Sequence, residues 1–398
     1  MAETYTLRGH GQMVADRVRM DAYMAALEGT VRPGCVVLDI GAGTGLMALA
    51  AARLGARKVY GVEPGDSVHV ARAVARDSGL ADRVEFIQEL STRVRLPERA
   101  DVIVSDLRGV LPLFQMHVAS IADARERLLA PGGVLIPRRD TLFAAPVEAP
   151  DEHRILTAPW DDGGSGLDLR VPRRAVLNTW AKANIGPGQL LTEPRTWAEL
   201  DYRTRVDPDV RETLEWTVER AGTVHGIGAW FHADLADGAS FTTGPLAPEI
   251  IYGTAFFPLL EPVPVAAGHA VQVELQARLV AEDYVWVWNT AVRRADGSRV
   301  AFRQSTFLSQ ISTPEDLRRR AHDYRPALGE DGEIDRWVLQ RMDGAATLEE
   351  IARDVQRRFP ERFRTWEDAM WRVGGLSQRY ARRGEGGERG GGPGRVRS

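Results

Sequence analysis

The sequence contains very little cysteine and no long apolar run. Cys35 is the only cysteine in the chain of 398 residues, so no disulfide can form within it and a zinc cluster would lack ligands. No apolar stretch approaches the roughly 18 residues that cross a bilayer, and the opening MAETYTLRGHG lacks the apolar segment of a signal peptide. We therefore expect a cytoplasmic protein with no membrane contact and no bound metal.

A strong excess of charge of either sign is also missing. The formal net charge is -4 and 44% of the residues are hydrophobic, which is ordinary for a globular chain and argues against a general nucleic-acid binder. The length is large for one core, so two or three domains are expected.

The order of predicted elements indicates the fold of the first part. From residue 35, apolar strand-like runs alternate with helical stretches up to GVLIP at 133–137. This alternation predicts a parallel sheet covered on both faces, hence an α/β Rossmann-like domain over residues 1–138. Between residues 139 and 312 the strand-like runs follow one another, which predicts a β-rich, barrel-like domain with an irregular insertion at about 159–200.

The C-terminal part returns to helical periodicity. Residues 330–382 predict a small helical domain, and Thr347 followed by Glu350 fits a capping box at the start of one helix. The last residues, 383–398, are rich in glycine and arginine and are expected to be disordered.

One motif carries most of the chemical information. In VLDIGAGTG a buried strand runs into a turn with Gly41, Gly43 and Gly45, where side chains would block a ligand and where positive φ is expected. The third glycine follows the second by two positions, whereas the dinucleotide fingerprint needs three, so nicotinamide chemistry is disfavoured. Glu63 ends the second strand, where a carboxylate can accept both hydroxyl protons of a ribose.

Asp39, at the end of the first strand, suits a cationic ligand group. A ribose without a pyrophosphate, together with a cationic group, indicates S-adenosylmethionine (SAM) as the cofactor. Glycine turns also occur for tight packing alone, but the strand, Asp39, the glycines and Glu63 together favour the cofactor.

These motifs resemble the protein arginine methyltransferases. The likeness lies in HGQMVADRVRMDAY, GARKVYGVEP and SDLRGVLPLFQ, followed by ARERLLAPGGVLIP. It implies an N-terminal helix over the cofactor whose Arg19 binds the cofactor carboxylate, and it places Thr92 at the adenine. It also implies that the insertion at 159–200 is a dimerisation arm, so a homodimer is expected.

The acceptor pocket departs from the family pattern. Two glutamates that hold the substrate guanidinium correspond here to Asp106 and Gln115, and the family's Thr-His-Trp loop corresponds to residues 250–252, which end in Tyr252. Asp106, Gln115 and Tyr252 are the candidate catalytic residues. His117 is a secondary candidate, read mainly as a solvated helix residue. One charge in place of two predicts poor binding of a guanidinium.

The C-terminal segment from Glu333 to Tyr380 is similar to the pyrroloquinoline quinone peptide chaperone family, which implies a small winged-helix-like domain. Relatives in that family bind leader segments of precursor peptides by strand addition. A generic helical packing unit is the alternative. For the whole chain we expect a SAM-dependent methyltransferase acting on a nitrogen or oxygen of a peptide, protein or small molecule such as a natural product. The alternative is a non-catalytic scaffold that binds a peptide.

Overall fold

The computed structural model describes residues 6–161 and 166–382, so the tail predicted to be disordered lies outside the described residues. The chain divides into two compact units, Met1–Ile311 and Ser312–Ser398.

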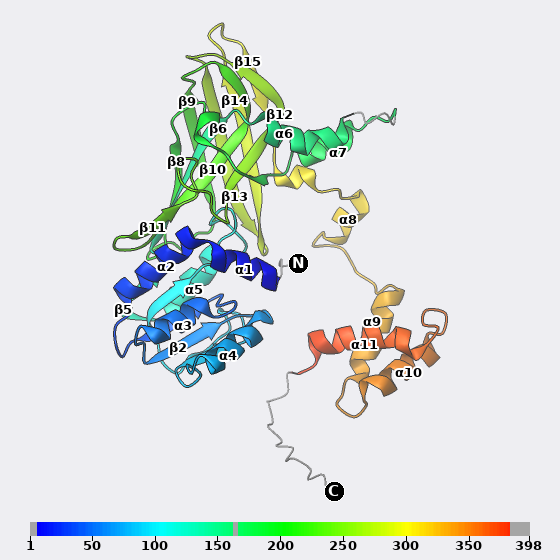
Figure 1. Cartoon of the computed structure of the whole chain (residues 1–398). Helices are drawn as coiled ribbons and strands as arrows, with labels where there is room; N and C mark the ends of the chain where they lie inside the picture. Colours follow the sequence, from blue (N-terminus) through cyan, green and yellow to red (C-terminus); the bar gives the residue numbers. More distant parts are fainter. Residues whose placement is uncertain (1–5, 162–165, 383–398) are drawn as a thin grey trace, which may run out of the picture. The chain divides into compact units, whose positions relative to one another are not determined.

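A parallel sheet forms the first layer of unit 1 (Figure 1). Its strand order is β3-β2-β1-β4-β5, and Val37 of the central strand pairs with Val59 and Val102. Every residue of β1 is buried, as expected for a strand covered on both faces. The elements are β1 (Val36–Ile40), α3 (Leu46–Arg53), β2 (Lys58–Val62), α4 (Ser67–Asp77), β3 (Val84–Ile87), β4 (Ala100–Ser105), α5 (His117–Arg127) and β5 (Leu129–Ile136).

Two N-terminal helices, α1 (Leu7–Ala15) and α2 (Arg17–Thr30), lie between this sheet and the β-rich domain (Figure 1). Asp16 separates them: one carboxylate oxygen caps α2 by accepting the Arg19 amide at 3.2 Å, and the other accepts the Ile251 amide at 2.8 Å. Asp16 thus fastens the start of α2 to a loop of the β-rich domain.

The β-rich domain consists of two antiparallel sheets, and Trp286 and Trp288 are buried in its core. With the parallel sheet and the C-terminal helices, it confirms the predicted fold class. The six-stranded sheet contains β6 (Arg139–Val147), β7 (Ala181–Ala183), β8 (Arg195–Asp201), β10 (Gly222–Ala236), β11 (Ala239–Thr242) and β12 (Thr254–Val265). The four-stranded sheet contains β9 (Val210–Thr217), β13 (Ala270–Val280), β14 (Asp283–Arg293) and β15 (Arg299–Phe302).

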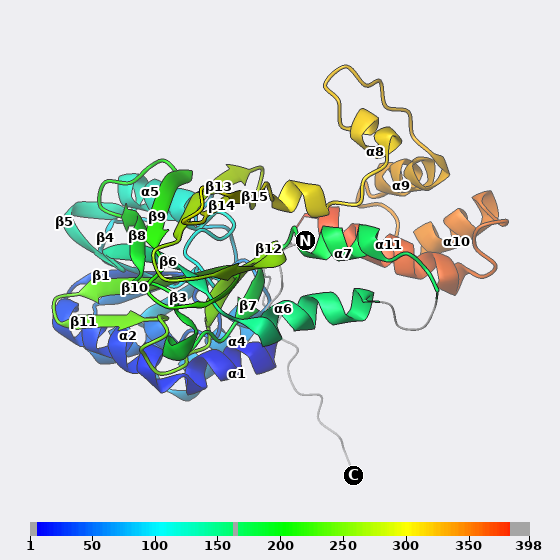
Figure 2. The same ribbon diagram turned by 90° about the horizontal axis from the view of Figure 1, so that it is seen from above.

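A pair of helices projects from the β-rich domain, as Figure 2 shows. They are α6 (Pro150–Thr157) and α7 (Arg170–Val176), with a 3-10 turn at Ala158–Trp160. The irregular insertion was expected at about 159–200, but the helices begin at residue 150, and β7 and β8 belong to the sheet. Only the first part of the predicted insertion therefore leaves the β core.

Unit 2 is helical in its described part. It comprises α8 (Pro314–Arg319), α9 (Glu330–Arg341), α10 (Leu348–Arg358) and α11 (Trp366–Tyr380), and the last three share a core that includes Ile334, Ile351 and Val373. The predicted capping box of Thr347 and Glu350 is present. Residues 312–382 contain no strand that would form a wing. Among all described residues, no helix is long and apolar enough to cross a membrane, and no metal-binding group of His, Cys, Asp and Glu is found.

Candidate active site

The glycine turn after β1 has the backbone that the motif predicts. Gly41, Gly43 and Gly45 have φ values of 73°, 53° and 85°, a region that other residues rarely adopt. A Cβ atom on Gly41 would lie 2.4 Å from the Leu107 side chain, and one on Gly45 would lie 2.6 Å from that of Phe86. Both conformation and packing therefore require glycine at these two positions.

Two carboxylates flank the turn. Glu63 accepts the Gly43 amide at 3.0 Å through Oε2 and the Gly65 amide at 2.7 Å through Oε1. Asp39 is 2% exposed and accepts the Ala48 amide at 3.0 Å. The structure thus brings together the glycines, Asp39 and Glu63, the main part of the predicted cofactor site.

The electrostatics at Asp39 favour a cation. Burial, together with the negative charges of Glu63 and Asp106, raises the pKa of Asp39 to about 7, despite the hydrogen bond from Ala48. A positively charged ligand group beside Asp39 would offset this cost of ionisation. The site is therefore suited to a ligand that carries both hydroxyl groups and a positive charge.

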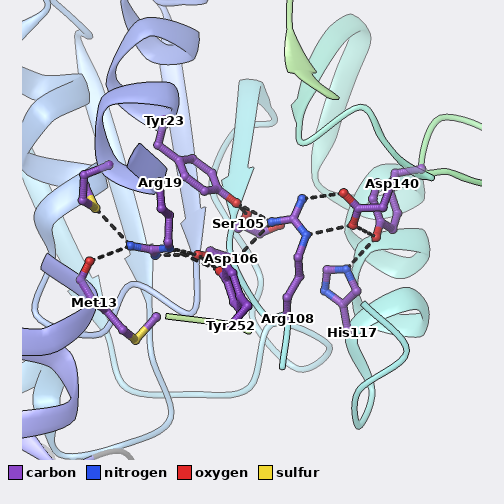
Figure 3. Close-up of polar contacts among 11 residues, drawn as sticks. Met13, Arg19, Tyr23, Ser105, Asp106, Arg108, His117, Asp140 and Tyr252 are labelled. Atoms are coloured by element: carbon purple, nitrogen blue, oxygen red, sulfur yellow. Dashed lines mark hydrogen bonds and ion pairs between the residues drawn. The ribbon is translucent and has the colours of Figure 1, made fainter. Parts of the chain in front are cut away.

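Arg19 and Asp106 form a buried ion pair where α2 crosses the end of β4 (Figure 3). The Nη2 atom of Arg19 lies 2.5 Å from Oδ2 of Asp106, and Nε donates to the same oxygen at 2.6 Å. Nη1 donates to the Met13 carbonyl at 3.0 Å. From the sequence, Arg19 was expected to bind the carboxylate of the cofactor. That carboxylate would have to share the Arg19 guanidinium with Asp106.

Asp106 has further partners on its other oxygen. Oδ1 accepts the Tyr252 hydroxyl at 2.6 Å and Nη1 of Arg108 at 3.1 Å. Burial disfavours the charged form of Asp106, but attraction from Arg19 and Arg108 outweighs this and lowers its pKa below the ordinary value. Asp106 and Tyr252, from distant parts of the sequence, are therefore joined in one site, and Asp106 is ionised and a weak base.

A second buried ion pair continues the network and was not foreseen from the sequence. Nε and Nη2 of Arg108 donate to the two oxygens of Asp140 at 2.8 and 2.9 Å, a bidentate pair in which both side chains are 0% exposed. Asp140 also accepts the Tyr202 hydroxyl at 2.5 Å. Arg19 and Arg108 thus balance the charges of Asp106 and Asp140. Arg108 lies in the motif SDLRG and could have been singled out as a site residue, but nothing in the sequence indicated that Asp140 would be its partner.

His117 corrects one expectation, because it is not a solvated helix residue. It is 2% exposed, and its Nε2 lies 2.8 Å from the Tyr202 hydroxyl. Burial lowers the pKa of His117 to about 3, and the positive charge of Arg108 contributes to this shift. A neutral imidazole that resists protonation cannot serve as an effective base near neutral pH.

His117 should also make folding sensitive to pH. Below pH 6.5 the unfolded chain takes up a proton at this histidine, whereas the folded chain does so only near pH 3, so stability falls as the pH drops through this window. At pH 5 the loss should be about 2 kcal/mol relative to pH 7.5. Unfolding free energies of the native chain and His117→Gln at both pH values measure it. An equal loss in both proteins would contradict the assignment.

The two remaining predicted residues differ in their surroundings. Gln115 is half-buried with a φ of 43°, and its side-chain amide has no hydrogen-bond partner within the described part of the chain. A non-glycine residue in this conformation stores strain, and such residues cluster at functional sites. Thr92 is exposed in the turn after β3, and its assignment to the adenine stays a prediction.

Comparisons with known proteins agree with the geometry. Residues 21–138 match the profile of the ribosomal protein L11 methyltransferase (PrmA) family. Protein arginine N-methyltransferase 2 of Mus musculus is 31% identical over 282 residues, which cover 67% of this chain and 63% of the mouse protein. Protein arginine N-methyltransferase 6 of Danio rerio is 31% identical over 233 residues, which cover 56% of this chain and 67% of the fish protein.

Solved structures give the same result for the fold. The structure of protein arginine methyltransferase 10 of Arabidopsis thaliana has a TM-score of 0.66 at 25% identity and covers 76% of this chain and 97% of its own. The PRMT1 enzyme–prozyme complex of Trypanosoma brucei with AdoHcy has a TM-score of 0.69 at 21% identity, covering 76% and 99%. This chain spans less than two thirds of the full length of protein arginine N-methyltransferase 2, namely 63% of the Mus musculus protein and 65% of the Homo sapiens protein.

Proposed function

We propose that this chain, which belongs to the protein arginine N-methyltransferase family, is a SAM-dependent methyltransferase whose acceptor is not an arginine guanidinium. The observation that carries the proposal is the state of Asp106. Its carboxylate, which would have to face the acceptor, is already bonded to Arg19, Arg108 and Tyr252.

The residues at the glycine turn fit the cofactor. Glu63 would accept the ribose hydroxyl protons, and Asp39 would face the ammonium. Arg19 would meet the carboxylate while remaining paired with Asp106. The raised pKa of Asp39 supports a cationic ligand. SAM, when bound, supplies a methyl group activated by a sulfonium. The protein's part is to orient the acceptor for in-line approach and to exclude water.

The charge balance favours a neutral acceptor. Asp106 and Asp140 are offset by Arg19 and Arg108, so neither of these two carboxylates offers an unpaired negative charge to a guanidinium. Gln115, whose amide can both donate and accept, is left to orient the acceptor. We propose a nitrogen or oxygen of a peptide, protein or natural product as the methyl acceptor.

The first test is cofactor binding. Glu63→Ala should weaken SAM binding by about 1.5 to 3 kcal/mol for each lost charged hydrogen bond. Glu63→Gln, which retains one oxygen acceptor for the glycine turn, should lose less. Isothermal titration calorimetry measures both, and equal melting temperatures control for folding. No SAM binding by the native chain would refute the proposed function, whereas unchanged affinity of both variants would place the ribose elsewhere.

We also propose a homodimer formed through the helix pair α6–α7. The pair exposes apolar side chains that a second copy would cover: Ile155 is 64% exposed and Val171 is 80% exposed. The double variant Ile155→Glu with Val171→Glu should be monomeric by light scattering, because buried charges would oppose association. Leu246→Glu with Val280→Glu, which alters exposed positions outside the pair, is the matched control and should stay dimeric. If the native chain were monomeric and still methylated its acceptor, the proposed role of the helix pair in dimerisation would be rejected.

Unit 2 is proposed to bind a leader segment of a precursor peptide. Because residues 312–382 contain no strand, addition of a strand has no template there, and the segment would bind to a helix surface. Leu328 and Leu339 line a hollow beside α9 and are 55% and 38% exposed, which suits apolar peptide side chains.

A further inference from the structure

A groove separate from the candidate active site runs along β5, the edge strand of the parallel sheet. It has a volume of about 710 Å³, and none of the residues assigned to cofactor or acceptor lines it. Its walls are the end of α2, most of β5, part of α5, and the segments just before β4, after β8 and after β10. We propose that this groove binds an acidic peptide segment that also carries aliphatic side chains.

The first support is positive charge. Five arginines line the groove, against a single lining carboxylate, that of Asp237. Two of the five, Arg138 and Arg203, are paired with carboxylates, those of Asp237 and Asp201 respectively. The other three, Arg32, Arg99 and Arg125, therefore determine how strongly the groove attracts an anion.

Those three arginines are bonded mainly to neutral groups. Arg32 donates to the Gly29 carbonyl at 2.6 Å, and Arg99 donates to the Leu129 carbonyl at 3.0 Å; neither has an ion-pair partner among residues 6–161 and 166–382. Arg125 donates to the Tyr202 carbonyl at 2.6 Å, and the carboxylate nearest to it, that of Glu126, is 3.9 Å away. Their charge is therefore available to carboxylates of a ligand.

The second support is an apolar strip between the arginines. Leu129, Pro131, Val134 and Leu135 line the groove along β5. A phosphate backbone would use the arginines but would leave this apolar strip without a partner. A peptide with alternating acidic and aliphatic side chains satisfies both features. A volume of this size accommodates a short segment rather than a folded domain.

The position of the groove is a third support. β5 ends the sheet order β3-β2-β1-β4-β5, so within residues 6–161 and 166–382 no further strand of the sheet covers its outer side. Exposed strand edges are common sites for extended peptides. The inference does not depend on the acceptor chemistry, because its residues take no part in methyl transfer.

Binding of a defined probe tests the proposal. The probe is a fluorescein-labelled synthetic peptide of alternating glutamate and leucine, titrated with the full chain and followed by fluorescence anisotropy. Arg32→Gln with Arg99→Gln should weaken binding about tenfold or more, because two charge-assisted contacts are lost. Both side chains are exposed, so the fold should persist, with an unchanged melting temperature as the check.

The matched control is Arg76→Gln with Arg299→Gln, which removes the same charge from exposed positions outside the groove. It should bind the probe like the native chain. Equal weakening in both double variants would show only a general charge effect and overturn the proposal. No binding by the native chain would overturn it as well, as would displacement of the probe by single-stranded DNA of equal charge at equal concentration.

Discussion

Replacing Arg108 with methionine should lower the free energy of unfolding of unit 1 by about 3 to 5 kcal/mol, because the change leaves the buried carboxylate of Asp140 without its ion pair. Asp140 is 0% exposed and receives two hydrogen bonds from Arg108, so its charge cannot be transferred to water. Asp106 would lose a contact too, but it keeps Arg19 and Tyr252. Denaturant unfolding followed by circular dichroism measures the effect.

The control is a double-mutant cycle. Asp140→Leu alone should cost a similar amount, since Arg108 would then be buried with only Asp106 as its carboxylate partner. Removal of both charged groups in Arg108→Met with Asp140→Leu should cost clearly less than the sum of the two single changes. Additive costs, or single changes below about 1 kcal/mol, would contradict a strongly coupled buried pair.

The parts of the site that sequence alone predicted are those fixed by local backbone. Gly41, Gly43 and Gly45 adopt positive φ because the turn between a parallel strand and its helix demands it, and the demand is visible in the residues themselves. Asp39 and Glu63 follow from their positions at the ends of β1 and β2. The fold class was likewise predictable, since the spacing of apolar residues sets strand and helix order.

The parts that sequence did not predict are contacts between distant elements. Asp140 meets Arg108 only because β6 of the β-rich domain begins beside the loop after β4, and no local pattern encodes that proximity. His117 is buried for the same reason: Tyr202, which follows β8, lies against its ring. The bounds of the irregular insertion, predicted at about 159–200, differ from the structure because the excursion begins with α6 at Pro150, and the second half of the predicted stretch contains β7 and β8, which pair with the sheet.

The network also bears on which acceptors the proposed methyltransferase could use. A guanidinium is held and activated by two carboxylates, which attract it and orient the nucleophilic nitrogen. Here one of the two positions is the neutral Gln115. At the other, Asp106 is occupied by two arginines of the protein itself and by the Tyr252 hydroxyl. An incoming arginine would therefore find no free carboxylate and would meet the positive charge of Arg19 and Arg108.

The native chain should accordingly methylate arginine-rich peptides at least about a hundredfold more slowly than an enzyme with two free carboxylates, because each lost charge-assisted contact costs about 1.5 to 3 kcal/mol. The measurement is transfer of label from SAM to such peptides by the native chain and by the double variant Asp106→Glu with Gln115→Glu. The variant restores the two glutamates of the family pattern, so it should gain arginine methylation. Equal SAM affinity of both proteins, measured by calorimetry, separates the acceptor pocket from the cofactor site. Rapid arginine methylation by the native chain would defeat the argument, since it would require a carboxylate other than Asp106 to hold the guanidinium.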